Sequence, residues 1–191
     1  MFITIEGIDG SGKSTQSLKL SEWLEGYTHK KTIRTHEPYS FREFILTSRG
    51  ISPMSELLLF LADRAEHVNR VIIPEIESGH NVICERYNDS TLAYQCGGHG
   101  LNSEHVKSII DSCSFPVPDL KILLDVNPET AYSRVIQRHN LNDKFEAEGL
   151  SLMKRVSDFY RSLEGYIVID CSDMNESEVF AEIISELEKT L

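Results

Sequence analysis

The sequence predicts an α/β fold of three layers, in which a five-stranded parallel sheet lies between two layers of helices. Five short apolar runs alternate with longer segments of helical character. Strands that alternate with helical crossovers are typical of a parallel sheet covered on both faces. The expected strands are residues 2–5, 31–35, 81–84, 120–126 and 166–169, and the expected helices are residues 14–23, 55–70, 103–113, 129–138, 150–163 and 176–191.

A glycine-rich turn joins the first expected strand to the first expected helix. Phe2, Ile3 and Ile5 form the apolar run, and leucines recur in the helix-compatible segment that follows the turn. Residues 7–14 read GIDGSGKS, which fits the pattern Gly-x-x-x-x-Gly-Lys-Ser. A strand before this pattern and a helix after it distinguish a phosphate-binding loop, or P-loop, from a chance glycine-rich turn.

Each part of this loop is suited to holding a triphosphate. Glycines adopt backbone angles closed to other residues, which lets successive N–H groups point at an anion. Lys13 supplies a positive charge to the terminal phosphates, and the Ser14 hydroxyl is placed to ligate a Mg²⁺ ion that bridges them. We therefore expect ATP at this loop. The expected ATP-binding residues are Gly7, Ile8, Asp9, Gly10, Ser11, Gly12, Lys13, Ser14 and Thr15.

Composition predicts one globular domain over residues 1–191, since 40% of the residues are hydrophobic and 26% are charged. The formal charge is −11, from 19 Lys and Arg against 30 Asp and Glu, so nucleic acid and anionic membranes are not expected as partners.

The chain shows neither a long apolar stretch nor a secretory signal, which predicts a cytoplasmic protein. Its four cysteines lack C-x-x-C spacing and are expected to be reduced thiols. The sequence GGHG at residues 97–100 predicts a mobile loop.

Charged residues follow the third expected strand, at the edge of the sheet where parallel α/β proteins bind ligands. In the segment VICER, Glu85 ends the apolar run, at a position where a carboxylate commonly holds Mg²⁺ in P-loop proteins. Arg86 offers a planar fork of donors that can clamp a second phosphate. The alternative is a surface Glu-Arg pair with no ligand.

A second pair of residues lies in the expected helix at 55–70. Phe60 and Arg64 are four residues apart in an otherwise apolar segment, so they share one face of the helix. A ring and a guanidinium group would then reach one spot together. The alternative is a core phenylalanine and an arginine at the rim whose charged end extends to solvent.

Five segments together, FITIEGIDGSGKSTQ, HEP, LFLADRAEH, VICERYNDSTLAYQ and DKFE, resemble in this order the thymidylate kinase family, whose members phosphorylate dTMP to dTDP with ATP. FLADR and RYNDSTLAYQ are the most specific segments, because they build the thymidine monophosphate site in that family. The resemblance extends over nearly the whole chain. It implies a P-loop NTPase fold with a short lid at about residues 138–147, a step of dTTP biosynthesis, ATP with Mg²⁺, and usually a homodimer.

The resemblance also implies roles for matching residues. In the family the aromatic residue of FLADR stacks on thymine and its arginine hydrogen-bonds the base, which implies these roles for Phe60 and Arg64. The strand-end arginine, Arg86 here, binds the monophosphate. Ser14 and Glu85 are the expected metal ligands. The remaining residues expected to bind the substrate are Asp9, Glu37, Arg42, Thr91, Tyr94 and Gln95.

Catalysis in this reading consists of neutralising charge around the transferred phosphoryl group, since a phosphate monoester needs no general base. Lys13, Arg86 and a lid cation are expected to do this. The lid of the family usually reads Asp-Arg-Phe-Glu, whereas residues 143–146 read DKFE. Arg138 is the expected lid cation, because its planar fork can bridge two phosphates, and Lys144 is the alternative.

The sequence is also compatible with two other functions. A deoxynucleoside kinase that acts on thymidine could use Glu85 as a general base toward a neutral hydroxyl. A P-loop switch that hydrolyses a nucleotide is a third reading, because one fold hosts many functions. The switch reading leaves Phe60 and Arg64 without a role, and the chain lacks the guanine-reading motif Asn-Lys-x-Asp.

Overall fold

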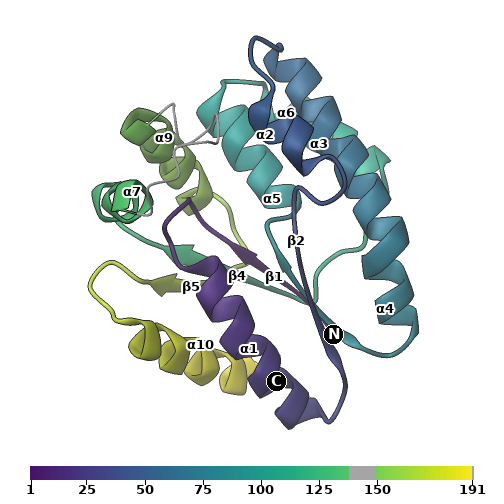
Figure 1. The fold of residues 1–191 in the computed structure, drawn as a ribbon, viewed down its shortest axis with the longest axis vertical. Helices are drawn as coiled ribbons and strands as arrows, with labels where there is room; N and C mark the ends of the chain where they lie inside the picture. The colour runs from purple at the N-terminus through teal and green to yellow at the C-terminus, as the bar shows by residue number, and fades with distance from the viewer. Residues whose placement is uncertain (138–148, 191) are drawn as a thin grey trace.

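The structure is a parallel sheet of five strands between two layers of helices (Figure 1). It is a computed structural model that describes residues 1–137 and 149–190. The strands lie in the order β2-β3-β1-β4-β5. Their bounds are β1 (Phe2–Glu6), β2 (Thr32–His36), β3 (Asn81–Glu85), β4 (Leu120–Asp125) and β5 (Ile167–Asp170). The predicted α/β fold is confirmed, and each strand lies within one residue of its predicted position at either end.

Helices connect the strands and cover both faces of the sheet. Their bounds are α1 (Lys13–Thr28), α2 (Arg42–Thr47), α3 (Pro53–His67), α4 (Ile73–Glu77), α5 (Asn88–Thr91), α6 (Ser103–Ser112), α7 (Pro128–Gln137), α9 (Gly149–Arg161) and α10 (Glu176–Thr190), with π-helical segments η1 (Val68–Ile72) and η2 (Leu92–Gly98). Helices α1 and α10 pack together on one side, whereas α3, α6 and α9 lie on the other (Figure 1). None of the helices described is both long and apolar enough to span a membrane.

Strand β1 lies at the centre of the sheet because it is apolar towards both faces. Phe2, Ile3 and Ile5 are at most 2% exposed, and burying each such side chain contributes about 1.5–3 kcal/mol. Within the parallel ladders, Ile5 lies opposite Glu85 of β3 and Ile122 of β4. The carboxyl ends of β1 and β3 therefore lie side by side, which places the glycine-rich turn beside the turn that follows β3.

Helix α3 begins two residues before the predicted start, and the helical run that it opens extends past the predicted end at residue 70. The Ser52 hydroxyl accepts the backbone N–H of Ser55 at 3.1 Å, and Pro53 occupies the first helical turn, where its missing N–H is not needed. Beyond α3 the chain continues through η1 into α4. Pro74 supplies no N–H to that helix, and the wider π-helical turn directly precedes it.

The prediction of a mobile loop at residues 97–100 is wrong for Gly97 and Gly98. Gly97 and Gly98 end η2, which packs closely on α9. A Cβ atom on Gly97 would lie 2.5 Å from Cβ of Phe159, and one on Gly98 would lie 2.7 Å from Cδ1 of Leu152. Glycine is therefore required at both positions because η2 and α9 approach closely. The same glycines in the sequence are typical of a mobile turn, which explains the wrong prediction.

Replacing Gly97 with Ala is expected to lower the free energy of unfolding by about 1–3 kcal/mol, because the added methyl group overlaps Phe159. Urea unfolding measures this change. Gly26→Ala is the matched control, since its added Cβ in α1 would have no atom within 4 Å. The control should be stabilised by up to about 1 kcal/mol through helix propensity. Equal responses from the two variants would contradict the close packing of η2 on α9.

Candidate active site

Residues 7–15, the phosphate-binding loop, connect β1 to α1 through backbone angles that only glycine adopts readily. Gly7 has φ +140° and Gly10 has φ +82°. Space is also limiting, because a Cβ on Gly10 would lie 2.4 Å from the carbonyl oxygen of Ala131 in α7. The loop therefore presses against α7 on one side and leaves its other side to a ligand.

Lys13 folds back over this loop. Its Nζ donates to the carbonyl oxygens of Gly7 and Ile8, both at 2.9 Å, and the residue is buried. Burial, together with the nearby Arg86, lowers the pKa of Lys13 to about 7. A phosphate bound in the loop would favour the protonated form of Lys13. The ammonium group could then bind that phosphate directly.

Glu85 and Ser14 place hard oxygen donors beside the loop. The Glu85 carboxylate accepts hydrogen bonds from Ser14 Oγ at 2.6 Å and from Ser17 Oγ at 2.5 Å, and Arg34 lies 3.5 Å away. Burial opposes ionisation of Glu85, but the two hydroxyl donors outweigh it and lower the pKa. An ionised carboxylate next to a hydroxyl is a donor set that suits Mg²⁺.

A second group of potential metal ligands lies deeper, where Glu37, His67 and Cys84 approach within 4.8 Å of one another. Both ring nitrogens of His67 are already engaged, by Glu37 at 3.1 Å and by Thr35 Oγ1 at 2.6 Å. The Glu37 carboxylate is also paired with Arg64. Glu37 and His67 therefore belong to a hydrogen-bonded network, and the Cys84 thiol donates to the carbonyl oxygen of Arg86 at 3.1 Å, so the three residues are not an open set of ligands.

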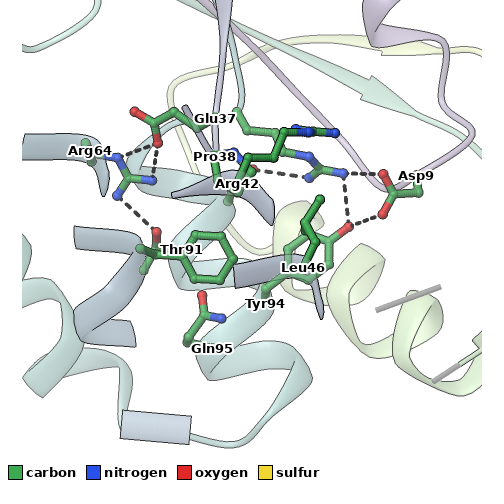
Figure 2. Close-up of a pocket in the computed structure, with 12 residues that line it drawn as sticks. Asp9, Glu37, Pro38, Arg42, Leu46, Arg64, Thr91, Tyr94 and Gln95 are labelled. Atoms are coloured by element: carbon green, nitrogen blue, oxygen red, sulfur yellow. Dashed lines mark hydrogen bonds and ion pairs between the residues drawn. The ribbon is translucent and has the colours of Figure 1, made fainter. Parts of the chain in front are cut away.

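Arg86 connects the phosphate-binding loop to the turn after β3. Its guanidinium donates to Asp9 Oδ1 at 2.5 Å and to the Tyr94 hydroxyl at 3.2 Å, and that hydroxyl donates to Asp9 Oδ2 at 3.0 Å (Figure 2). Burial would raise the pKa of Asp9, but Arg86 and Lys13 outweigh it and lower the pKa to about 2. Asp9 is thus an anion held between two cations.

The backbone of Arg86 adopts a left-handed conformation, with φ +68°, which is uncommon outside glycine. Buried Glu6 stabilises this turn. Its carboxylate accepts the backbone N–H of Tyr87 at 2.7 Å, the hydroxyl of Ser90 at 2.5 Å and the hydroxyl of Tyr160 at 2.9 Å. Burial raises the pKa of Glu6, the nearby Asp89 adds to the rise, and the hydrogen bonds oppose it. Three donors from two segments therefore converge on one carboxylate.

Two adjoining cavities meet at Arg86. The inner pocket contains about 550 Å³ of space between protein atoms, part of which is open to solvent. Its lining residues are Asp9, Glu37, Pro38, Arg42, Leu46, Phe60, Arg64, Arg86, Ser90, Thr91, Tyr94 and Gln95 (Figure 2). The loop cleft is lined by Asp9, Gly10, Gly12, Lys13, Ser14, Thr15, Arg34, His36, Glu37, Arg42, Glu85 and Arg86. Asp9, Glu37, Arg42 and Arg86 line both cavities.

All nine residues predicted to bind the substrate line the inner pocket, Arg42 included. Five further residues were not predicted. Pro38, Leu46 and Ser90 line the inner pocket, and Arg34 and His36 line the loop cleft. Ser90 lies in α5, and its hydroxyl accepts a hydrogen bond from Arg86 Nη1 at 3.4 Å. Arg86 precedes the helix in a left-handed conformation, so no helical spacing in the sequence identifies this contact.

Arg64 occupies the end of the inner pocket, but its guanidinium is largely engaged within the protein. It pairs with Glu37 at 2.6 Å and donates to Thr91 Oγ1 at 3.0 Å and to the carbonyl oxygen of Tyr87 at 2.9 Å. Only 1% of the residue is exposed, so it is not the rim arginine that the alternative reading described. Glu37 outweighs burial and raises the pKa of Arg64, although burial is the largest single influence.

The predicted lid lies outside the described residues. Arg138, the expected catalytic cation, Lys144, its alternative, and the segment at 143–146 all fall between residues 138 and 148. The structure places the end of α7 at Gln137 and the start of α9 at Gly149.

Comparisons with known proteins agree on one family. The family model described as "Thymidylate kinase" matches residues 5–183. A thymidylate kinase of Synechococcus sp. (strain JA-3-3Ab) is 42% identical over 172 residues, covering 85% of this chain and 81% of the relative. One from Desulfovibrio desulfuricans is 38% identical and covers 94% and 91%. The crystal structure of thymidylate kinase from Ehrlichia chaffeensis superimposes with a TM-score of 0.75 at 31% identity, covering 98% of both chains.

Asp9→Asn tests the ion pair with Arg86 through the pH dependence of stability. The folded pKa of Asp9, about 2, lies below its unfolded value, so the stabilisation is fully present above pH ~4 and is lost as the pH falls towards 2. The wild type should exceed the variant by about 1 kcal/mol at pH 6, after allowance for a side chain that is about a third exposed. Urea unfolding at pH 6 and pH 3 should show this difference shrinking, and a constant difference would contradict the assignment.

Proposed function

The chain belongs to the thymidylate kinase family, and from this premise we propose how its residues act in the reaction of that family. The protein is an ATP-dependent dTMP kinase that transfers the γ-phosphoryl group of ATP to dTMP and releases ADP and dTDP. The observation that carries the residue assignment is the pair of adjoining cavities with Arg86 and Asp9 at their junction. A two-substrate phosphotransferase needs two anion sites that meet in this way.

ATP binds in the loop cleft, with its phosphates in the phosphate-binding loop. Backbone N–H groups of residues 7–15 face the phosphates, and the N-terminus of α1 adds a partial positive charge. Lys13 contacts the terminal phosphates. Ser14 and Glu85 hold Mg²⁺, which neutralises charge on the phosphate oxygens when it is bound. The hydroxyl–carboxylate contact at 2.6 Å supports this pair as ligands.

dTMP binds in the inner pocket, with its phosphate towards Arg86 and its base towards Phe60. Arg86 and Arg42 line both cavities and can contact the acceptor phosphate from two sides. Phe60 offers a ring for stacking against the base. Tyr94 and Asp9 support the guanidinium of Arg86, and Glu37 holds Arg64 at the end of the pocket. Thr91 and Gln95 line the base end.

Phosphoryl transfer needs no general base here, because the acceptor is an oxygen of a phosphate monoester whose second pKa is about 6. That oxygen attacks the γ-phosphorus of ATP, and the bond to the β-phosphate oxygen breaks. The residues lower the barrier by aligning two anions and stabilising the charge that spreads over the transferred group. Lys13 does this from the loop cleft and Arg86 from the junction of the two cavities. The deoxynucleoside kinase reading is not favoured by the family assignment.

The remaining assignments are also proposals. We assign residues 1–191 to one domain with a lid at 138–147, and Arg138 to the transferred phosphoryl group. Four free thiols support a reducing, cytoplasmic location. Large apolar side chains exposed on α2 and α3 support a homodimer, since such groupings mark protein interfaces. They are Phe44 at 58%, Leu58 at 53% and Met54 at 43% exposure.

Lys13→Ala is expected to lower the turnover number by about a thousandfold, because the variant loses the charge that faces the terminal phosphates. ADP release at saturating dTMP measures this. The control is Lys189→Ala, which removes an exposed lysine paired with Glu186 on α10 and should leave turnover unchanged. A Lys13→Ala protein with turnover near that of the control would contradict ATP binding at this loop.

Phe60→Ala is expected to raise the KM for dTMP about fivefold or more, since it removes a stacking surface worth on the order of 1 kcal/mol. The KM for ATP should change by less than about twofold, because Phe60 lines only the inner pocket. Initial rates with each substrate varied separately measure both constants. The opposite result, a raised KM for ATP alone, would show that the two cavities have been assigned in reverse.

A further inference from the structure

We propose that Glu56 is a positioning residue that fixes the side-chain amide of Gln95 with its oxygen towards the inner pocket, and so selects a base that presents an N–H group there. The proposal deepens the proposed function, on which it rests, because it concerns how the acceptor site distinguishes thymine from cytosine. Glu56 does not line the pocket itself. It acts through Gln95, which does.

The contact between the two side chains is buried and direct. Gln95 Nε2 donates to Glu56 Oε1 at 3.0 Å. Gln95 is 1% exposed and Glu56 is 6% exposed, so neither side chain can exchange this bond for one with bulk water. In Figure 2 the oxygen of Gln95 is turned to the side on which Thr91 is drawn, and its nitrogen is turned away from that side.

An ionised carboxylate can only accept hydrogen bonds, and this fixes the orientation of its partner. If the Gln95 amide rotated by half a turn, its oxygen would face the carboxylate without a proton between them. Two acceptors in contact at a buried site lose a hydrogen bond and repel each other. Glu56 lies in the first turn of α3, where the helix dipole stabilises a negative charge. His99 Nε2 lies 3.4 Å from the same oxygen.

A fixed acceptor at the base end of the pocket distinguishes the two pyrimidines. Thymine carries an N–H between its two carbonyl groups, which can donate to the Gln95 oxygen. Cytosine carries a lone pair at that ring nitrogen and would meet the oxygen acceptor to acceptor. Sites built to hydrogen-bond a substrate reject analogues that leave a buried polar group unpaired. An amide free to rotate would instead offer its N–H₂ end to cytosine.

Glu56→Gln removes this constraint with little change of shape. A glutamine at position 56 can donate or accept, so either orientation of the Gln95 amide finds a partner. We expect the ratio of kcat/KM for dTMP to that for dCMP to fall about tenfold, through a higher KM for dTMP and a lower KM for dCMP. The kcat for dTMP should stay within about twofold of the wild type, because the phosphate contacts are unchanged. A purely structural role would lower kcat/KM for both substrates together.

The matched control is Glu66→Gln, the same substitution on the same helix at a surface position where Glu66 pairs with Arg70. It should leave the ratio unchanged. A double-mutant cycle with Gln95→Met isolates the coupling. If Glu56 acts through Gln95, Gln95→Met alone lowers the ratio, and adding Glu56→Gln changes it no further.

Three results would overturn the proposal. They are an unchanged ratio in Glu56→Gln, a further fall of similar size when Glu56→Gln is added to Gln95→Met, or a wild-type ratio in Gln95→Met. A wild-type ratio in Gln95→Met would overturn the proposal even if Glu56→Gln did not fold, because Glu56 is proposed to act only through Gln95. Failure of the proposed function is distinguishable, because the wild-type protein would then release no ADP with dTMP.

Discussion

The ion pair between Asp9 and Arg86 joins the two halves of the site. Asp9 belongs to the phosphate-binding loop and Arg86 to the turn after β3, and their side chains meet because β1 and β3 are neighbouring parallel strands. Each side chain neutralises the partly buried charge of the other, which would be unpaired if either residue were removed. The inner pocket and the loop cleft therefore share one wall, and two anionic substrates bound in them would meet beside a cation that is already aligned.

Two buried carboxylates, those of Glu6 and Glu37, stabilise the residues around this ion pair and the inner pocket. Glu6 binds the turn that carries Arg86 in its left-handed conformation, and Glu37 binds Arg64 at the far end of the inner pocket. A buried ion pair such as Glu37–Arg64 contributes little net stability, because desolvation offsets its attraction, but losing one partner costs about 3–5 kcal/mol. The two carboxylates hold polar groups in one geometry before a substrate arrives, which lowers the cost of ordering them on binding.

Sequence reasoning succeeded where a single physical signal dominates. The five strands could be predicted because each is an apolar run, and the phosphate-binding loop because its glycines and Lys13 have few other uses in that pattern. Short helices such as α2 and α5 span too few residues to show a helical period. Gly97 was misread because a glycine required by close packing looks like a glycine required by a turn. The role of Glu56 depends on a contact across 39 residues, which no local pattern reveals.

The central claim is that the inner pocket accepts a nucleoside monophosphate and that Arg86 binds its phosphate. The most direct measurement compares ADP release with dTMP and with thymidine as the acceptor, at equal concentrations and saturating ATP. The account predicts rapid ADP release with dTMP, and a rate with thymidine lower by at least about a hundredfold, because thymidine has no phosphate to engage Arg86. Faster release with thymidine than with dTMP would contradict the account and would assign Glu85 the role of a general base.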